Sequence, residues 1–201
     1  ESLQENVRTA VANRNAQGFS EQLEQTFEFI TNSLNSSIDG TFQFSGASTD
    51  TQPVNVTDLA SLAALPNVND AFDNADVAFE ARIADGVNIE FGLLADEVAT
   101  EAFEALLELY NFDTGVGGPI DGEIDDAQFA FLQTQIQTLG DTVDNLRQVE
   151  VDNGLSFNRL KVVEQQHTDT SIFLETFISD QEDVDLAEAV TELNNNQVAL
   201  Q

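Results

Sequence analysis

Apolar residues follow helical spacing in the first part of the chain. Steps of three and four residues, interrupted by one six-residue gap, separate Leu3, Val7, Ala10, Ala16, Phe19, Leu23, Phe27, Ile30 and Leu34. Such spacing is typical of an amphipathic helix with one buried face. It predicts one helix from Leu3 to Leu34, which ends before the turn pair Asp39-Gly40.

The last third of the chain follows a seven-residue repeat. One row of this repeat, which we call the leucine seam, consists of Leu132, Leu139, Leu146, Leu160 and Leu174, with Asn153 and His167 between them. The register holds from Leu132 to Ile178 and predicts a single helix through Gly154, where glycine costs about 1 kcal/mol relative to alanine. Near Ser179 the register changes within a capping-box sequence, so a second helix is predicted from there to Gln201.

The stretch DGTFQFSGASTDTQPVN, residues 39–55, contains the first predicted strand. Phe42 and Phe44 alternate with polar residues behind the Asp-Gly turn, so their rings share one face of a short strand that ends at Ser45-Gly46. Phe42, Phe44 and Gly46 therefore define a predicted structural hairpin.

A second hairpin is predicted over residues 77–92. Side chains alternate between the two faces of a strand, so both apolar rows face the same side only if Ile83 lies opposite Val87. That pairing leaves the three-residue loop Ala84-Asp85-Gly86, with Gly86 at a left-handed bulge position.

Two helices and a loop are predicted around this second hairpin. Either Thr57 or Asp58 is suited to cap a short helix through Leu65. The segment from Ala95 to Tyr110 has the spacing of an amphipathic helix, and residues 113–122 form a glycine-rich loop.

These elements predict a mainly α protein of a particular architecture. It is an elongated antiparallel helical bundle with a short β-hairpin and a small inserted α+β region. Residues 1–46 and 125–201 would form a discontinuous helical core domain, and residues 47–124 the inserted subdomain.

The charge balance of the chain is strongly acidic. It has 37 Asp and Glu against 6 Lys and Arg, a formal net charge of -31. Nucleic acids and anionic membrane surfaces are bound by basic patches, which this sequence lacks, so neither is an expected partner. The acidity fits a solvated surface, such as that of a protein from a salty habitat. The absence of cysteine excludes disulfides and thiol chemistry.

Candidate catalytic and metal-binding residues are few. His167 is the one histidine and lies on the leucine seam, where we expect a buried or boundary position. Its neighbours on the same side of the helix, residues 163, 164, 170 and 171, include one carboxylate, that of Glu164. Acidic pairs such as Asp125-Asp126 lie in polar stretches, which favour solvated faces over acid-base pairs. The glycine-rich loop is not followed by the Lys-Ser/Thr of a phosphate loop. We therefore expect no enzyme activity, no cofactor and no metal site.

Several segments, taken together, resemble the bacterial flagellin family. They are Leu3-Gln4 with its helix, the stretch DGTFQFSGASTDTQPV, the hairpin ARIADGVNIEFGLLADE, the helix DNLRQVEVDNGLSFNRL and the C-terminal EDVDLAEAVTELNNNQVALQ. Within the family they look most like the branch that forms the hook-filament junction (hook-associated protein 3). By this resemblance, we expect the chain to lack the family's outermost terminal helices, before Glu1 and after Gln201. The scarcity of basic residues departs from the family's pattern.

The resemblance implies a structural subunit of the bacterial flagellum, located outside the cell, with no catalytic role. Such a subunit would assemble by helical packing against other axial subunits, namely hook-associated proteins and flagellin. An export chaperone is also implied, as is a monomeric state for a chain without the outermost helices. A short flagellin of the filament itself is one alternative. A secreted surface binding or adhesion module is an alternative of another class.

Overall fold

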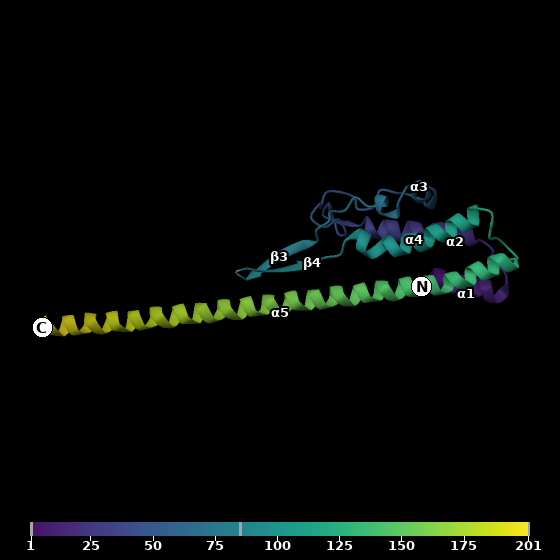
Figure 1. The fold of residues 1–201 in the computed structure, drawn as a ribbon. Coiled ribbons are helices and arrows are strands. Elements are labelled where there is room, and N and C mark those ends of the chain that lie inside the picture. Colours follow the sequence, from purple (N-terminus) through teal and green to yellow (C-terminus); the bar gives the residue numbers. More distant parts are fainter. Residues whose placement is uncertain (1, 85, 201) are drawn as a thin grey trace. The chain divides into compact units, whose positions relative to one another are not determined.

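The computed structural model describes residues 2–84 and 86–200 and is mainly helical (Figure 1). Its elements are α1 (Ser2–Asn13), α2 (Phe19–Leu34), β1 (Ser37–Ile38), β2 (Thr41–Phe42), α3 (Leu59–Ala63), the 3-10 helix η1 (Val68–Ala71), β3 (Phe79–Ala84), β4 (Val87–Phe91), α4 (Ala95–Thr114) and α5 (Asp126–Ala199). The chain divides into two compact units, with the boundary between Ser156 and Phe157.

Helix α1 and the first turns of α5 run antiparallel. The Gln4 side chain on α1 donates a hydrogen bond to the carbonyl of Ile136, and Arg14, just after α1, pairs with Asp126. The start of α1 therefore lies beside a later turn of α5, and the end of α1 lies beside the start of α5. The predicted packing of the N-terminal helix beside the C-terminal one is confirmed for this part of the chain.

Helix α4 lies antiparallel to both α2 and α5. Phe112 near the end of α4 stacks on Phe131 of α5, with ring centroids 3.8 Å apart. On the other side, Phe103 packs against Phe27 of α2 at 4.9 Å, and Asp113 accepts a hydrogen bond from Ser20. Helices α1, α2, α4 and the first part of α5 thus form an antiparallel bundle, which confirms the predicted fold class.

The prediction of one helix from Leu3 to Leu34 is wrong. The chain leaves α1 at Asn13 and enters α2 at Phe19, with left-handed backbone at Arg14 (φ 49°) and Gly18 (φ 72°). At about 100° per residue, the apolar positions before the six-residue gap would face the opposite side of a continuous helix from those after it. Only a reversal of the chain allows both sets to face the same core.

The prediction of a second helix from Ser179 is also wrong. Helix α5 continues from Asp126 to Ala199 without interruption, through both Gly154 and Ser179. The segment from Leu155 to Leu200 contains neither glycine nor proline, so nothing in its backbone chemistry ends the helix. A change in the phase of apolar positions alters the exposed face of a helix without breaking it.

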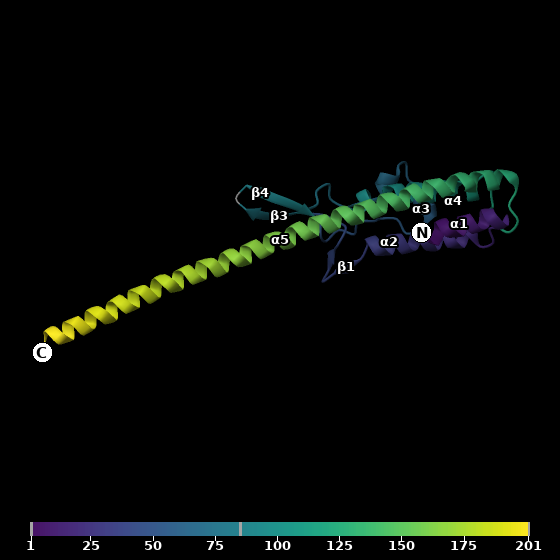
Figure 2. The ribbon, with the colours of Figure 1, turned by 90° about the horizontal axis from the view of Figure 1, so that it is seen from below.

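Strands β3 and β4 form a hairpin (Figure 1 and Figure 2). Its register agrees with the prediction along most of its length. Phe79 pairs with Phe91 and Arg82 with Asn88, as required if Ile83 faced Val87. The last step differs, because a bulge between Arg82 and Ala84 places Ala84 opposite Val87. Gly86 has a positive φ of 77°, as expected, whereas the predicted loop residue Asp85 lies outside the described residues.

Asp58 caps the short helix α3, which resolves the choice between Thr57 and Asp58. The Asp58 side chain accepts a hydrogen bond from the Ser61 N–H, and the Ser61 hydroxyl interacts in return with the Asp58 backbone, forming a capping box. Hydrogen bonds to the Asp58 carboxylate, of which the one from the Ser61 backbone N–H has the largest effect, lower the pKa of Asp58 below its ordinary value.

One hydrophobic cluster joins all the helices of the first unit. Val7, Phe27, Leu59, Leu106 and Leu132 are each at most 2% exposed within it. Two of these residues, Leu59 and Leu106, come from the predicted insert at residues 47–124. The separation of that insert from the helical core stays a prediction.

Candidate assembly surfaces

The hairpin after α2 begins with a tight turn. Ser37 pairs with Phe42 and Ile38 with Thr41, and positive φ at both Asp39 (52°) and Gly40 (82°) gives the turn expected for Asp-Gly. Strand β2 ends at Phe42, so Phe44 lies beyond the strand in which it was predicted.

The remaining predicted hairpin residues fix this segment to the helical core. Phe42 and Phe44 are half-buried; Phe44 packs against the hydrophobic core, and its carbonyl accepts a hydrogen bond from the Ala95 N–H at 3.0 Å. Gly46 is buried at φ 60°, and an added Cβ would lie 2.5 Å from both Leu94 Cδ2 and the Val77 carbonyl oxygen. The hairpin is therefore held where α4 begins.

The leucine seam has a different environment at each end. Leu132 and Leu139 are buried in the bundle core, and Leu146 and Leu160 are half-buried. Leu174 exposes 51% of its surface. The first two seam residues thus stabilise the bundle of the first unit, while the last remains available for contact.

Apolar side chains are exposed along the second unit. Every described side chain from Phe157 to Leu200 is exposed except those of Leu160 and Val163, which are half-buried. Four of the exposed apolar residues, which we call the α5 patch, are Phe173, Leu174, Phe177 and Ile178, each 51–66% exposed. Positions i, i+1, i+4 and i+5 share one side of a helix, so these four residues form a continuous apolar surface. Contiguous exposed apolar surface is characteristic of an interaction site.

His167 and the Asp125-Asp126 pair, which the sequence analysis considered as candidates for catalysis, lie in positions that do not form a catalytic site. His167 is exposed, which corrects the expected buried or boundary position, because its turn of α5 packs against no core. Asp125 caps α5 by accepting hydrogen bonds from the N–H groups of Ala127 and Gln128, while its neighbour Asp126 pairs with Arg14. The two carboxylates of this pair therefore have separate structural partners.

Asp113 holds the glycine-rich loop in place. Its carboxylate is buried and accepts hydrogen bonds from the Ser20 hydroxyl and the Ile120 N–H, both at 2.6 Å. On the other side of the loop, Gln128 donates to the carbonyls of Gly117 and Pro119. The loop is thus anchored by side chains from both adjoining helices.

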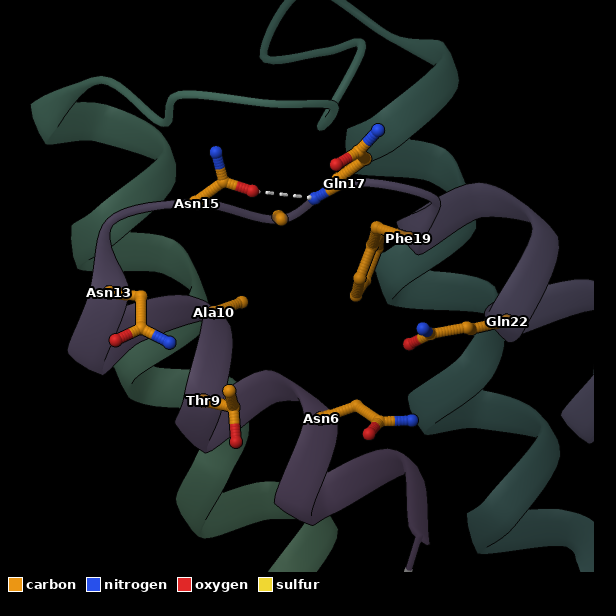
Figure 3. A pocket seen from close by; sticks show the side chains of 9 residues that line it. Asn6, Thr9, Ala10, Asn13, Asn15, Gln17, Phe19 and Gln22 are labelled. Carbon is orange, nitrogen blue, oxygen red and sulfur yellow. Dashed lines mark hydrogen bonds between the residues drawn. The ribbon is translucent and has the colours of Figure 1, made fainter.

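A groove between α1 and α2 is lined by uncharged residues. Two adjoining hollows of about 330 and 210 Å³ share Asn6 and Gln22, and no residue that lines either hollow is charged. Figure 3 shows Asn6 and Gln22 pointing toward one another across the larger hollow. We define the amide groove by Asn6, Thr9 and Asn13 on α1 and Gln22, Thr26 and Phe29 on α2. Sequence reasoning missed this groove, although its polar residues recur at helical spacing.

Two kinds of feature are absent from the described residues. No group of three or more His, Cys, Asp or Glu side chains in that part of the chain is arranged to hold a metal ion. No helix among the described residues is both long and apolar enough to cross a membrane.

Comparison with known proteins finds a solved structure of similar fold. No protein family profile and no curated protein matches the sequence. A solved structure provisionally described as a flagellar hook-associated protein from Vibrio parahaemolyticus is similar, with a TM-score of 0.56 and 18% identity over 89% of this chain and 80% of that one. At this identity the similarity shows a shared fold, a mainly helical bundle with a small β region.

Proposed function

We propose that this chain is a structural subunit of the bacterial flagellum that forms the hook-filament junction (hook-associated protein 3). The shared fold with a described hook-associated protein supports the flagellar part of the proposal. The resemblance of the Phe42–Gly46 hairpin and the leucine-seam helix to the flagellin family supports the same role.

The observation that carries the proposal is the exposure of the α5 patch. Four large apolar side chains, Phe173, Leu174, Phe177 and Ile178, lie on one side of a helix and are each more than half exposed. Full burial of an exposed side chain of this kind is worth about 1.5–3 kcal/mol, and these four have roughly half of that still to gain against a neighbour. A structural protein that packs its helices against those of adjacent subunits provides such a neighbour.

Repetition of one contact generates the assembly. A heterologous contact, in which different surfaces of two copies meet, repeats as a ring if the rotation closes and as a helical array if it does not. In this mechanism the subunit binds other axial subunits of the flagellum, and the chemistry is limited to packing and desolvation.

Gene deletion in the source bacterium tests the role. Cells without the gene should make hooks that carry no filament, and a plasmid copy should restore the filaments. A Phe173→Ser/Phe177→Ser copy should fail to restore them while the purified variant keeps its helical circular dichroism. The matched control, Val77→Ser/Val116→Ser, removes two exposed apolar residues outside α5 and should restore filaments.

The outcomes separate the possibilities. Normal flagella in the deletion strain, or full restoration by the α5 patch variant, would contradict the proposal. The alternative role as a filament subunit is distinguished by copy number in isolated flagella, because a junction ring is sparse whereas a filament protein dominates.

A further inference from the structure

The amide groove has the spacing of a surface that receives a helix. Asn6, Thr9 and Asn13 follow steps of three and four residues along α1, and Gln22, Thr26 and Phe29 do so along α2. Two rows of this kind on adjacent helices form the concave side of a helix-packing site. Phe29, which is 74% exposed, adds an apolar contact at one end of the groove.

The absence of charged side chains in the groove restricts what binds there. The chain carries a formal charge of -31, so most of its surface repels a second copy. None of the residues that line the groove is charged. A second copy can therefore approach the groove without placing carboxylates against one another, provided that the segment it presents is also uncharged.

The chain contains such a segment near the end of α5. Residues 193–200, LNNNQVAL, are uncharged, and every one of their side chains is exposed. Val198 and Leu200 are 74% and 88% exposed and lie beside three asparagines and a glutamine. The longer uncharged run at residues 127–140 does not fit, because Leu132, Gln135 and Leu139 are already buried in the bundle.

We infer that the amide groove binds residues 193–200 of a second copy of this chain. Side-chain amides both donate and accept hydrogen bonds, so the asparagines and glutamine of the segment complement Asn6, Asn13 and Gln22. The apolar side chains of the segment cover Phe29. This inference rests on the proposed role in one respect, since a second copy is available in a flagellar assembly. The contact is heterologous and adds a second interface to the α5 patch.

Disulfide trapping tests the contact, because the natural chain has no cysteine. One preparation of the full chain carries Asn13→Cys and another carries Gln197→Cys; the two are mixed at high concentration and oxidised. We expect heterodimers in at least about tenfold excess over a mixture of Ala12→Cys with Gln197→Cys, since a disulfide requires Cα atoms within about 7 Å. Ala12 is exposed on the same helix but does not line the groove. Equal yields in the two mixtures would overturn the inference.

Isosteric charge variants provide the second readout. Asn6→Asp with Gln22→Glu, added to the Asn13→Cys chain, should lower heterodimer yield by about tenfold, because a carboxylate that is desolvated against the uncharged segment has no opposite charge to pair with. Gln133→Glu with Gln137→Glu adds the same two charges on an exposed face of α5 and should leave the yield unchanged. Equal losses from both pairs would show general repulsion and contradict the groove contact.

Other occupants give distinct results. Asn13–Asn13 homodimers without heterodimers would indicate a two-fold contact between grooves and overturn the inference. If the protein restores filaments in the deletion strain but does not cross-link, the inferred groove contact is wrong and the proposed function still stands. If the deletion strain has normal flagella, the proposed function is wrong, and the cross-linking experiment still tests the groove contact independently.

Discussion

The Gln4 side chain on α1 donates from Nε2 to the carbonyl oxygen of Ile136 on α5, 3.2 Å away and 132 positions later in the sequence. This hydrogen bond fixes the register of two helices from opposite parts of the chain. One turn farther along α5, a Cβ added to Gly140 would lie 2.9 Å from the same Gln4 nitrogen. Gly140 therefore leaves room for the Gln4 side chain.

We predict that the effect of Gly140→Ala depends on Gln4. In the natural chain, the helix-propensity gain of about 1 kcal/mol is offset by displacement of Gln4 and loss of its hydrogen bond, also worth about 1 kcal/mol. In a Gln4→Ala background the same substitution should raise the free energy of unfolding by about 1 kcal/mol. Urea unfolding of the four proteins measures the coupling. Equal effects of Gly140→Ala in both backgrounds would show that the two residues do not interact.

Gly46 should be the most sensitive glycine of the hairpin. In Gly46→Ala, alanine must adopt a left-handed backbone conformation, and its Cβ would clash with Leu94 and the Val77 carbonyl. We expect the free energy of unfolding to fall by about 3 kcal/mol. Gly40→Ala is the matched control, since Gly40 also has positive φ but nothing lies within 4 Å of its added Cβ. The control should cost about 1–2 kcal/mol. Comparable losses at the two positions would contradict the described packing.

Gln135 is a buried residue whose replacement should stabilise the protein. It is 1% exposed, and its Oε1 has no hydrogen-bond partner among the described residues. Gln135→Leu removes the desolvation cost of that oxygen, so the free energy of unfolding should rise by about 1–2 kcal/mol. Thermal and urea unfolding measure the change.

Gln128 provides the opposite case on the same helix. It is 9% exposed, accepts a hydrogen bond from the Asp125 N–H and donates to the carbonyls of Gly117 and Pro119. Gln128→Leu should therefore lower the free energy of unfolding by about 2 kcal/mol. If Gln135→Leu destabilises the protein as much as Gln128→Leu, the assignment of an unsatisfied oxygen at Gln135 is wrong.

Salt should stabilise the bundle. Exposed carboxylates repeat along α4 at Glu97, Glu101, Glu104 and Glu108, and the last three line a hollow together with Asp141 of α5. Like charges three or four residues apart repel, and raising NaCl from about 0.01 M to about 1 M shortens the screening length from about 30 Å to about 3 Å. The melting temperature should rise across this range.

A charge-neutral pair on α4 should reduce the response to salt. Glu104→Gln/Glu108→Gln should melt higher than the natural chain at low salt and gain less from added NaCl. Glu28→Gln/Asp50→Asn removes the same charge from exposed positions elsewhere and should have a smaller effect. A melting temperature that falls or stays constant as NaCl is added would show that repulsion between carboxylates does not destabilise the bundle.

Local chemistry made part of this fold predictable. The Asp39-Gly40 turn, a helix cap at Thr57 or Asp58 and the register of the β3–β4 hairpin each depend on a few neighbouring residues. The structure confirms the turn, selects Asp58 as the cap and keeps the predicted register except at the bulge beside Val87. The division between α1 and α2 was visible as a six-residue gap, but its meaning depends on where the rest of the core lies.

The surfaces were harder to predict than the elements. A seven-residue repeat specifies which residues share a face, but the burial of Leu132 and the exposure of Leu174 depend on which other helices reach each turn of α5. The amide groove was missed because Asn6, Asn13 and Gln22 are polar, and a search for apolar periodicity ignores them. Both the burial pattern of the leucine seam and the amide groove depend on tertiary contacts, which the spacing of residues along the sequence does not specify.

Immunogold electron microscopy of flagella from the source bacterium tests the proposed role most directly. Antibodies raised against the full chain, and shown to give no signal on the deletion strain, are applied to intact flagella. The account predicts gold particles at one position on each flagellum, between the hook and the filament. Flagella that carry no gold at any position, while the protein is detected elsewhere in the cell, would contradict it.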